Sequence, residues 1–238
     1  MNPFYKFAHP ICRHFRMRRV QKFIDTFQPT PETRILDVGG LPRFWSTTLP
    51  INARITILNL EPLDANEASY ATPNMTCIVG DGTCLPFADE EFDIVFSNSV
   101  VEHVGTLMNQ VSFALEARRV GRGYWVQTPA HEFPIEPHYW SPFIHWLPKH
   151  LQRRLLRNFT LWGIMGRPEP EDVDSALAEV RLMNRREVTE LFPDAHLWTE
   201  RVCGLAKSYT AFRLPQSLPQ IAVPSALSTS AAVQPQAC

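Results

Sequence analysis

The sequence predicts an α/β fold built on a doubly wound, mostly parallel sheet. Three observations support this class: a buried strand that closes in a glycine turn, an acid about 20 residues further on at the end of a second strand, and polar residues at the ends of two more strands. Ligands of such sheets bind outside the carboxyl ends of the strands. We therefore expect the functional residues at that edge.

The first strand lies within residues 34–43. Its apolar run, Ile35-Leu36 and then Val38, is typical of a central parallel strand, and it ends at Gly39-Gly40. Glycine allows close approach of the backbone to a ligand, and Asp37 places a carboxylate at the mouth of the crevice. This pattern indicates a nucleotide-like cofactor.

The next three strands also end in polar residues. We expect strands over 54–61, 76–80 and 92–99, with a helix beginning near 100–104. Glu61 lies where doubly wound folds bind ribose hydroxyls, because a carboxylate accepts two hydrogen bonds from a diol. Each such acid can alternatively serve as a turn former or helix cap. Cys77 and Cys84 are expected to be buried packing residues.

The remaining elements follow in order. Residues 1–32 form a basic, helical N-terminal lead, and 33–213 the main domain. Asn184 and Glu187 resemble a capping box at the start of a helix. The uncharged tail, 214–238, is expected to be disordered. Further expected elements are a helix over 106–119, a strand over 123–128, an insertion over 130–172, a helix over 174–183, and strands over 195–202 and 205–213.

Four motifs in this order resemble the class I S-adenosylmethionine (SAM)-dependent methyltransferases, and within them the type 11 group. They are Asp-Val-Gly-Gly (37–40), the strand end at Glu61, Gly-Asp-x-x-x-Leu-Pro-Phe (80–87) and Phe-Asp-Ile-Val-Phe-Ser-Asn (92–98). The resemblance covers residues 33–213. It implies a Rossmann-like, seven-stranded sheet with an antiparallel final strand.

The resemblance also implies a cofactor site for SAM. Asp37, Gly39 and Gly40 would line the methionine moiety, and Glu61 would hold the ribose, with Leu60 or Pro62 against the adenine. Asp81 would accept a hydrogen bond from the adenine amino group with Gly82 beside it, and Ser97 and Asn98 would lie near the methionine amino group and the acceptor. The family pattern Asp-x-Gly-x-Gly-x-Gly has glycines where this chain has Leu41 and Arg43, so the turn must take a different course.

The insertion after the fifth strand is expected to select the acceptor, because it overhangs the edge where the sulfonium methyl would lie. A hydroxyl acceptor needs a proton acceptor, and histidine suits that role near neutral pH. We expect His138 to be this base with Glu136 orienting it. The alternative is an aromatic lid; His131, His145 and His103 are further candidates. We expect no metal site, since the histidines lack the spacing of a helical ligand pair.

Composition narrows the class of protein. The formal net charge is −1, so nothing global favours nucleic acid, and five cysteines without Cys-x-x-Cys spacing predict neither disulfides nor zinc. We expect a cytoplasmic enzyme without a membrane span or signal peptide. The basic stretches 1–24 and 149–157 suggest contact with the inner membrane face or an acidic substrate; the alternative is ordinary amphipathic helices.

Three functions remain open. The first is a methyltransferase acting on a small-molecule or a lipid- or glycan-linked acceptor, at oxygen. The second is a methyltransferase-like binding module without catalysis, suggested by Leu41 and Arg43. The third is a nicotinamide-dependent Rossmann oxidoreductase, which predicts Gly-x-Gly-x-x-Gly where the chain has Gly39-Gly-Leu-Pro-Arg-Phe44. Oligomeric state is not predicted.

Overall fold

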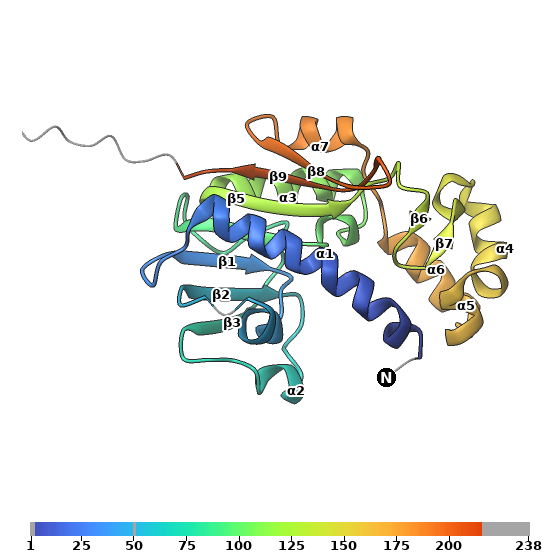
Figure 1. Cartoon of the computed structure of the whole chain (residues 1–238), viewed down its shortest axis with the longest axis horizontal. Helices are drawn as coiled ribbons and strands as arrows, with labels where there is room; N and C mark the ends of the chain where they lie inside the picture. Colours follow the sequence, from blue (N-terminus) through green and yellow to red (C-terminus); the bar gives the residue numbers. More distant parts are fainter. Residues whose placement is uncertain (1–2, 50, 216–238) are drawn as a thin grey trace, which may run out of the picture.

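The computed structural model describes residues 3–49 and 51–215, and the side chains from residue 13 onward. Most of the tail predicted to be disordered (216–238) lies outside these residues. A seven-stranded sheet forms the centre of the molecule, in the order β3-β2-β1-β4-β5-β9-β8 (Figure 1). The strands are β1 (Arg34–Val38), β2 (Arg54–Asn59), β3 (Met75–Val79), β4 (Phe92–Asn98), β5 (Gly121–Pro129), β8 (His196–Val202) and β9 (Leu205–Arg213).

The pairing of the strands confirms the predicted fold class. Strands β1 to β5 are parallel, whereas β9 is antiparallel to both β5 and β8. The strand order reverses between β1 and β4, which creates the crevice where ligands of doubly wound sheets bind.

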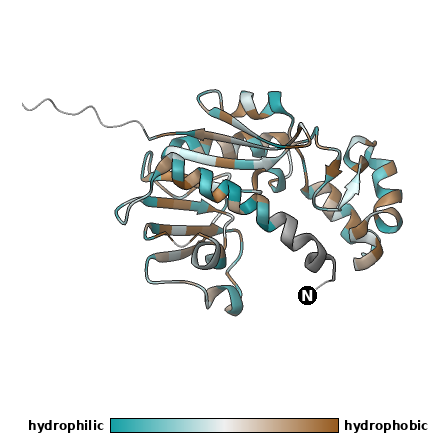
Figure 2. Cartoon of the chain, viewed as in Figure 1, coloured by the Kyte–Doolittle hydropathy of each residue, from teal (hydrophilic) through white to brown (hydrophobic). Residues whose placement is uncertain are grey.

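Helices cover both faces of the sheet. One face packs against α3 (Leu107–Val120) and α7 (Arg185–Leu191), and the other against α1 (Pro3–Phe27) and the π-helical turn η1 (Phe44–Thr48). Each central strand is apolar on both sides, because its successive side chains point to opposite faces. Strands β1 to β3 are largely brown (hydrophobic), while the coloured part of α1 alternates between hydrophilic and hydrophobic residues (Figure 2).

The segment after β5 forms a separate lobe beside the carboxyl end of the sheet (Figure 1). Its own small core contains Tyr139, Ile144, Leu156 and Val173. The lobe consists of the hairpin β6 (Ile135–Glu136) and β7 (Ser141–Pro142), η3 (Ile144–Trp146), α4 (Lys149–Phe159), α5 (Leu161–Gly166) and α6 (Pro170–Glu179). A short helix, α2 (Ala65–Ala68), follows β2.

Two sequence predictions were wrong in detail. Helix α6 spans 170–179 rather than 174–183, because Pro170 occupies its first turn and Glu169 and Asp172 form a capping box. Residues 180–183 are instead extended beside the sheet. Cys77 and Cys84 are exposed rather than buried, since β3 is an edge strand and the loop after it lies at the surface. The capping box of Asn184 and Glu187 is confirmed.

Helix α1 belongs to the core of the domain. Phe23 is fully buried, with its ring 5.0 Å from that of Phe96 and 5.7 Å from that of Trp125. Within the described residues, no helix combines the length and apolar composition needed to cross a membrane.

We expect Phe23→Ala to lower the free energy of unfolding by about 3–5 kcal/mol, because it leaves a cavity between α1 and the sheet. Lys22→Ala, one residue earlier on the exposed side, should change it by less than about 0.5 kcal/mol. Urea unfolding of both variants measures this. Equal stabilities would show that α1 is dispensable for the core.

Candidate functional site

The glycine turn after β1 is shaped by a buried carboxylate. Gly39 has a φ of +76°, which favours glycine, and a Cβ on Gly40 would lie 1.6 Å from Oδ2 of Asp37. Asp37 is 1% exposed, and its Oδ2 accepts a 2.6 Å hydrogen bond from Nε1 of Trp45. Both glycines are therefore required by the turn itself.

The structure also explains the departures from the family's glycine pattern. Leu41 is exposed, and Arg43 forms an ion pair with Glu67 at 3.0 Å while its guanidinium stacks on Tyr70. Asn59 donates a hydrogen bond to the carbonyl of Gly40, which ties the turn to the end of β2. The chain thus continues into η1 where the family pattern has two further glycines.

Burial raises the pKa of Asp37 to about 7, although the hydrogen bond from Trp45 acts in the opposite direction. The predicted contact of Asp37 with the methionine moiety stays a prediction. Its side chain in this structure faces Trp45 beneath the turn and positions the backbone of Gly39 and Gly40.

The residues predicted to hold the nucleoside lie at adjacent strand ends. Glu61 is exposed just beyond β2, next to Leu60, which is 72% exposed. Asp81 is exposed beyond β3, where its Oδ1 accepts two 2.8 Å hydrogen bonds from Thr83. A Cβ on Gly82 would lie 2.8 Å from Val38, so this glycine is required by packing of the loop. Glu61 and Asp81 are thus accessible along the same edge of the sheet.

The end of β4 divides its two predicted residues between different roles. Ser97 is fully buried and its Oγ donates to the carbonyl of Val38, so it joins β4 to the turn. Asn98 is partly exposed, and its Oδ1 accepts a hydrogen bond from Nε of Arg19 on α1. Ser99 follows with a φ of +59° and a hydrogen bond to Gln127. Asn98 therefore faces the crevice and Ser97 does not.

A cavity of about 510 Å³ adjoins the ends of β4 and β5. Helix α1, the hairpin and β9 supply its other walls. Its lining combines aromatic and apolar side chains with a few polar groups, among them Phe15, Phe133, Trp140, Asn98, Ser99 and Gln127. Such a lining is typical of a small-molecule site.

Part of the basic N-terminal stretch is used inside the protein. Arg19 is 8% exposed and forms an ion pair with Glu200 on β8 at 3.1 Å. Lys207 also pairs with Glu200 and lies over the ring of Phe15. In α4, Leu156 packs in the core of the lobe while Arg154 and Arg157 are exposed. The stretch in α4 thus behaves as an amphipathic helix, and membrane contact by either stretch stays a prediction.

The predicted acid–base pair is present in the hairpin of the lobe. Nδ1 of His138 lies 2.6 Å from Oε1 of Glu136, whose Oε2 accepts a hydrogen bond from the backbone N–H of Tyr139. Burial lowers the pKa of His138, but the hydrogen bond and charge of Glu136 outweigh it and raise the pKa above its usual value. Glu136, 1% exposed, both orients the imidazole and closes the hairpin.

The turn after β4 places two more titratable groups beside His138. The rings of His103 and His138 are 4.7 Å apart in a T-shaped arrangement, and Nδ1 of His103 lies 3.1 Å from Oε1 of Glu179. Glu102 is fully buried and accepts a hydrogen bond from Thr128, and burial raises its pKa to about 7. In the sequence, Glu102 lies within the helix expected to begin near 100–104, and no pattern along the chain connects it with residue 138.

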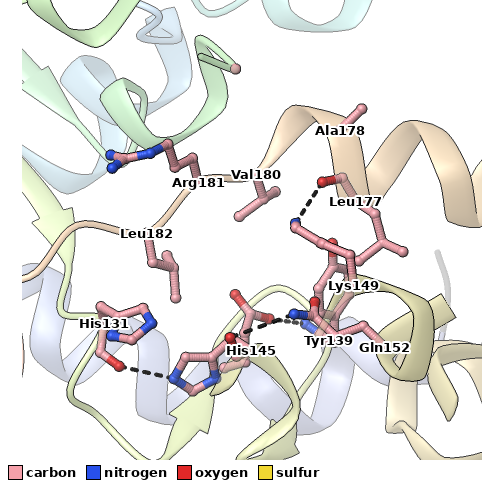
Figure 3. Close-up of a pocket in the computed structure, with 12 residues that line it drawn as sticks. His131, Tyr139, His145, Lys149, Gln152, Leu177, Ala178, Val180, Arg181 and Leu182 are labelled. Carbon is pink, nitrogen blue, oxygen red and sulfur yellow. Dashed lines mark hydrogen bonds between the residues drawn. The ribbon is translucent and has the colours of Figure 1, made fainter. Parts of the chain in front are cut away.

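The other two candidate histidines lie in a second cavity, of about 380 Å³, between the hairpin, α4 and residues 177–182 (Figure 3). Nε2 of His145 bonds the carbonyl of His131, and Lys149 donates to the carbonyl of Leu177 at another side of the cavity. These bonds hold the lobe together, and His131 and His145 do not meet the ends of β1 to β4.

The sequence matches a known family over its central part. The family model described as "Methyltransferase domain" matches residues 36–123, which run from β1 into β5. Residues 36–123 are therefore similar to the methyltransferase domain family. The match includes the turn, Glu61, Asp81 and Asn98, so the resemblance drawn from the motifs is confirmed for this segment.

Curated relatives of the methyltransferase domain are described as uncharacterized methyltransferases. One from Mycobacterium tuberculosis is 37% identical over 82 residues, and one from Mycobacterium avium is 37% identical over 75. The alignment spans 32% of this chain and 32% of the M. tuberculosis protein. The match thus covers about a third of the length of each protein.

Solved structures share the fold. A Rhodobacter sphaeroides structure described as putative Zn-dependent alcohol dehydrogenases has a TM-score of 0.54 and 13% identity, covering 84% of this chain and 90% of its own. The N-terminal domain of EvdMO1, determined in the presence of SAH and D-fucose, has a TM-score of 0.50 and 15% identity, covering 84% and 83%. At this identity the likeness shows the fold alone.

We expect Asp37→Asn to remove one pH-dependent component of stability. The folded protein keeps the Asp37 proton up to about pH 7, whereas an unfolded aspartic acid loses it near ~3.9. The contribution of Asp37 to the free energy of unfolding is therefore fully present below the pKa of unfolded aspartic acid. It is lost as the pH rises through the pKa of Asp37 in the folded protein. Asparagine cannot ionise and still accepts from Trp45.

Urea unfolding of the ligand-free protein at about pH 5 and about pH 8 tests this. The free energy of unfolding of Asp37→Asn relative to that of the original chain should rise between the two pH values. Parallel pH profiles would show that Asp37 is ionised in the fold.

Proposed function

We propose that this protein is a SAM-dependent methyltransferase. One observation carries the proposal: Glu61 and Asp81 are exposed at adjacent strand ends beside the Gly39-Gly40 turn, within a segment that matches the methyltransferase domain. SAM would lie along this edge, with its ribose on Glu61 and its adenine over Leu60. The exposed Leu60, Val79 and Leu41 support this placement, because an adenine ring would cover apolar surface there.

The cavity beside Asn98 supports an acceptor of limited size. Aromatic and apolar walls suit the body of a small molecule or the attached end of a lipid- or glycan-linked intermediate. Asn98, Ser99 and Gln127 offer hydrogen bonds to its polar end. We propose methyl transfer to an oxygen of such an acceptor, with positioning supplying much of the rate.

His138 is our proposal for the proton acceptor, with Glu136 as its positioning residue. The 2.6 Å contact engages Nδ1 and leaves Nε2 for a substrate proton. Pro137 and Trp140, on either side of His138 in the chain, line the acceptor cavity. The carboxylate of Glu136 raises the pKa of His138, which makes the neutral imidazole a stronger base.

We also propose that the protein is cytoplasmic and contacts an anionic membrane surface. The exposed arginines of α4 lie close in sequence to the exposed apolar residues Phe159 and Ile164, a combination that interfacial helices use. This contact would bring a lipid-linked acceptor to the lobe.

The two alternative functions make different predictions. A catalytically inactive module would bind SAM without turnover. A nicotinamide-dependent oxidoreductase would bind NADH, yet the turn holds one close glycine pair in place of Gly-x-Gly-x-x-Gly, and the family match is to a methyltransferase domain.

We expect Glu61→Ala to weaken SAM binding about tenfold or more, or ~1.4 kcal/mol, because the ribose diol loses its acceptor. Calorimetric titration with SAM, S-adenosylhomocysteine and NADH measures this, with Glu171→Ala, an exposed acid on α6, as the control. Unchanged SAM affinity in a folded Glu61→Ala protein would remove Glu61 from the site. Binding of NADH alone would favour the oxidoreductase.

We expect His138→Ala to lower turnover while leaving SAM affinity nearly unchanged, since His138 lies in the lobe and not at the ends of β1 to β3. The control is His145→Ala, which removes a histidine from the second cavity. An acceptor screen followed by steady-state kinetics measures both. Equal turnover by His138→Ala and the original chain would refute the role of His138.

A further inference from the structure

Three side chains from distant parts of the sequence converge beside the carboxyl end of β4. Glu102, His103 and His138 each place one donor atom within 4.8 Å of the donor atoms of the other two. Donors around a tetrahedral Zn²⁺ stand roughly 3.4 Å apart. The three side chains therefore need shifts of only about 1 Å to bind one ion.

Each of the three residues is held by a further side chain. Thr128 donates to Oε2 of Glu102, Glu136 engages Nδ1 of His138, and Glu179 engages Nδ1 of His103. Nε2 of each imidazole remains for a ligand. Carboxylate–histidine pairs of this kind orient metal-bound imidazoles and make them better donors.

Glu102 contributes a buried carboxylate, one oxygen of which has no partner. Oε1 of Glu102 is shielded from solvent and has no hydrogen-bond partner among the described residues, in a side chain that is fully buried. Leaving such an oxygen unpaired is costly. A cation between the three donors would satisfy it.

The backbone that carries Glu102 and His103 is rigid. Gln110 of α3 donates to the carbonyl of Val101, and the N–H of Arg181 donates to the carbonyl of Glu102. The side chains of His103 and His138 are 31% and 22% exposed, so the site also has a route from solvent. A preorganised, partly open set of donors is characteristic of a catalytic metal site rather than a closed structural one.

We propose that Glu102, His103 and His138 bind a divalent transition-metal cation. Two imidazoles and one carboxylate suit Zn²⁺, Fe²⁺ or Co²⁺ better than Mg²⁺ or Ca²⁺, which prefer oxygen ligands. The open coordination position would take water or an acceptor hydroxyl. This inference rests on the proposed function, because a bound cation would use the same Nε2 of His138 that proton acceptance requires. In the metal-loaded protein the cation would activate the acceptor, and His138 would act as the base only in the metal-free protein.

The test is calorimetric titration of the full-length, chelator-treated protein with Zn²⁺, without SAM or acceptor. One ion should bind per chain. His103→Ala and Glu102→Gln should each weaken binding more than about a hundredfold, and Glu179→Gln about tenfold. His150→Ala, which removes an exposed imidazole on α4, is the matched control and should bind as the original chain does.

Absence of Zn²⁺ binding, or equal affinity in the original chain, His103→Ala and Glu102→Gln, would overturn the proposal. Thermal melting checks the fold of each variant. Should the buried Glu102→Gln variant fail to fold, the visible spectrum of bound Co²⁺ is compared between the original chain, His103→Ala and Glu179→Gln. Identical spectra in all three would overturn the proposal. Glu61→Ala should bind Zn²⁺ normally. Loss of the metal site and loss of the SAM site are therefore separate results.

Discussion

Burial of the central strands on both faces is the constraint from which the rest of the structure follows. Ile35 and Leu36 point to opposite helical layers, as do Ile94 and Val95. A polar side chain on these strands must therefore be paired inside the sheet or lie at its carboxyl edge. Most of the polar groups of the site occupy one of these two positions.

Two buried carboxylates show what this constraint does. Asp37 accepts a hydrogen bond from Trp45, which lies in η1, eight residues later in the chain. One carboxylate oxygen of Glu102 accepts a hydrogen bond from Thr128 of β5, and the other has no hydrogen-bond partner among the described residues. The first carboxylate is thus structurally satisfied beneath the glycine turn, whereas the second is available to a ligand. Their similar raised pKa values, each about 7, arise from burial in both cases.

The lobe adds titratable side chains to the edge of the sheet. Its hairpin carries Glu136 and His138 against the turn after β4, and α6 contributes Glu179 to His103. Helix α1 closes another side, where Arg19 links Asn98 to Glu200. In the proposed function, the acceptor is therefore selected and activated by segments outside strands β1 to β5, while the ends of these strands hold the methyl donor.

The sequence by itself determined the strands and their polar ends, because alternation and glycine turns are local signals. The seven-stranded sheet with its antiparallel final strand was implied only by the family resemblance, and the order of its strands is seen in the structure. It also identified the Glu136–His138 pair, whose members are two residues apart and stiffened by neighbouring prolines. Only the tertiary structure decided that the side chain of Ser97 points inward, that Trp45 donates a hydrogen bond to Asp37, and that Glu102 and His103 lie beside His138. These contacts join segments up to 59 residues apart, and no periodicity or spacing along the chain encodes which side chains a crossover connection and a separate lobe will bring together.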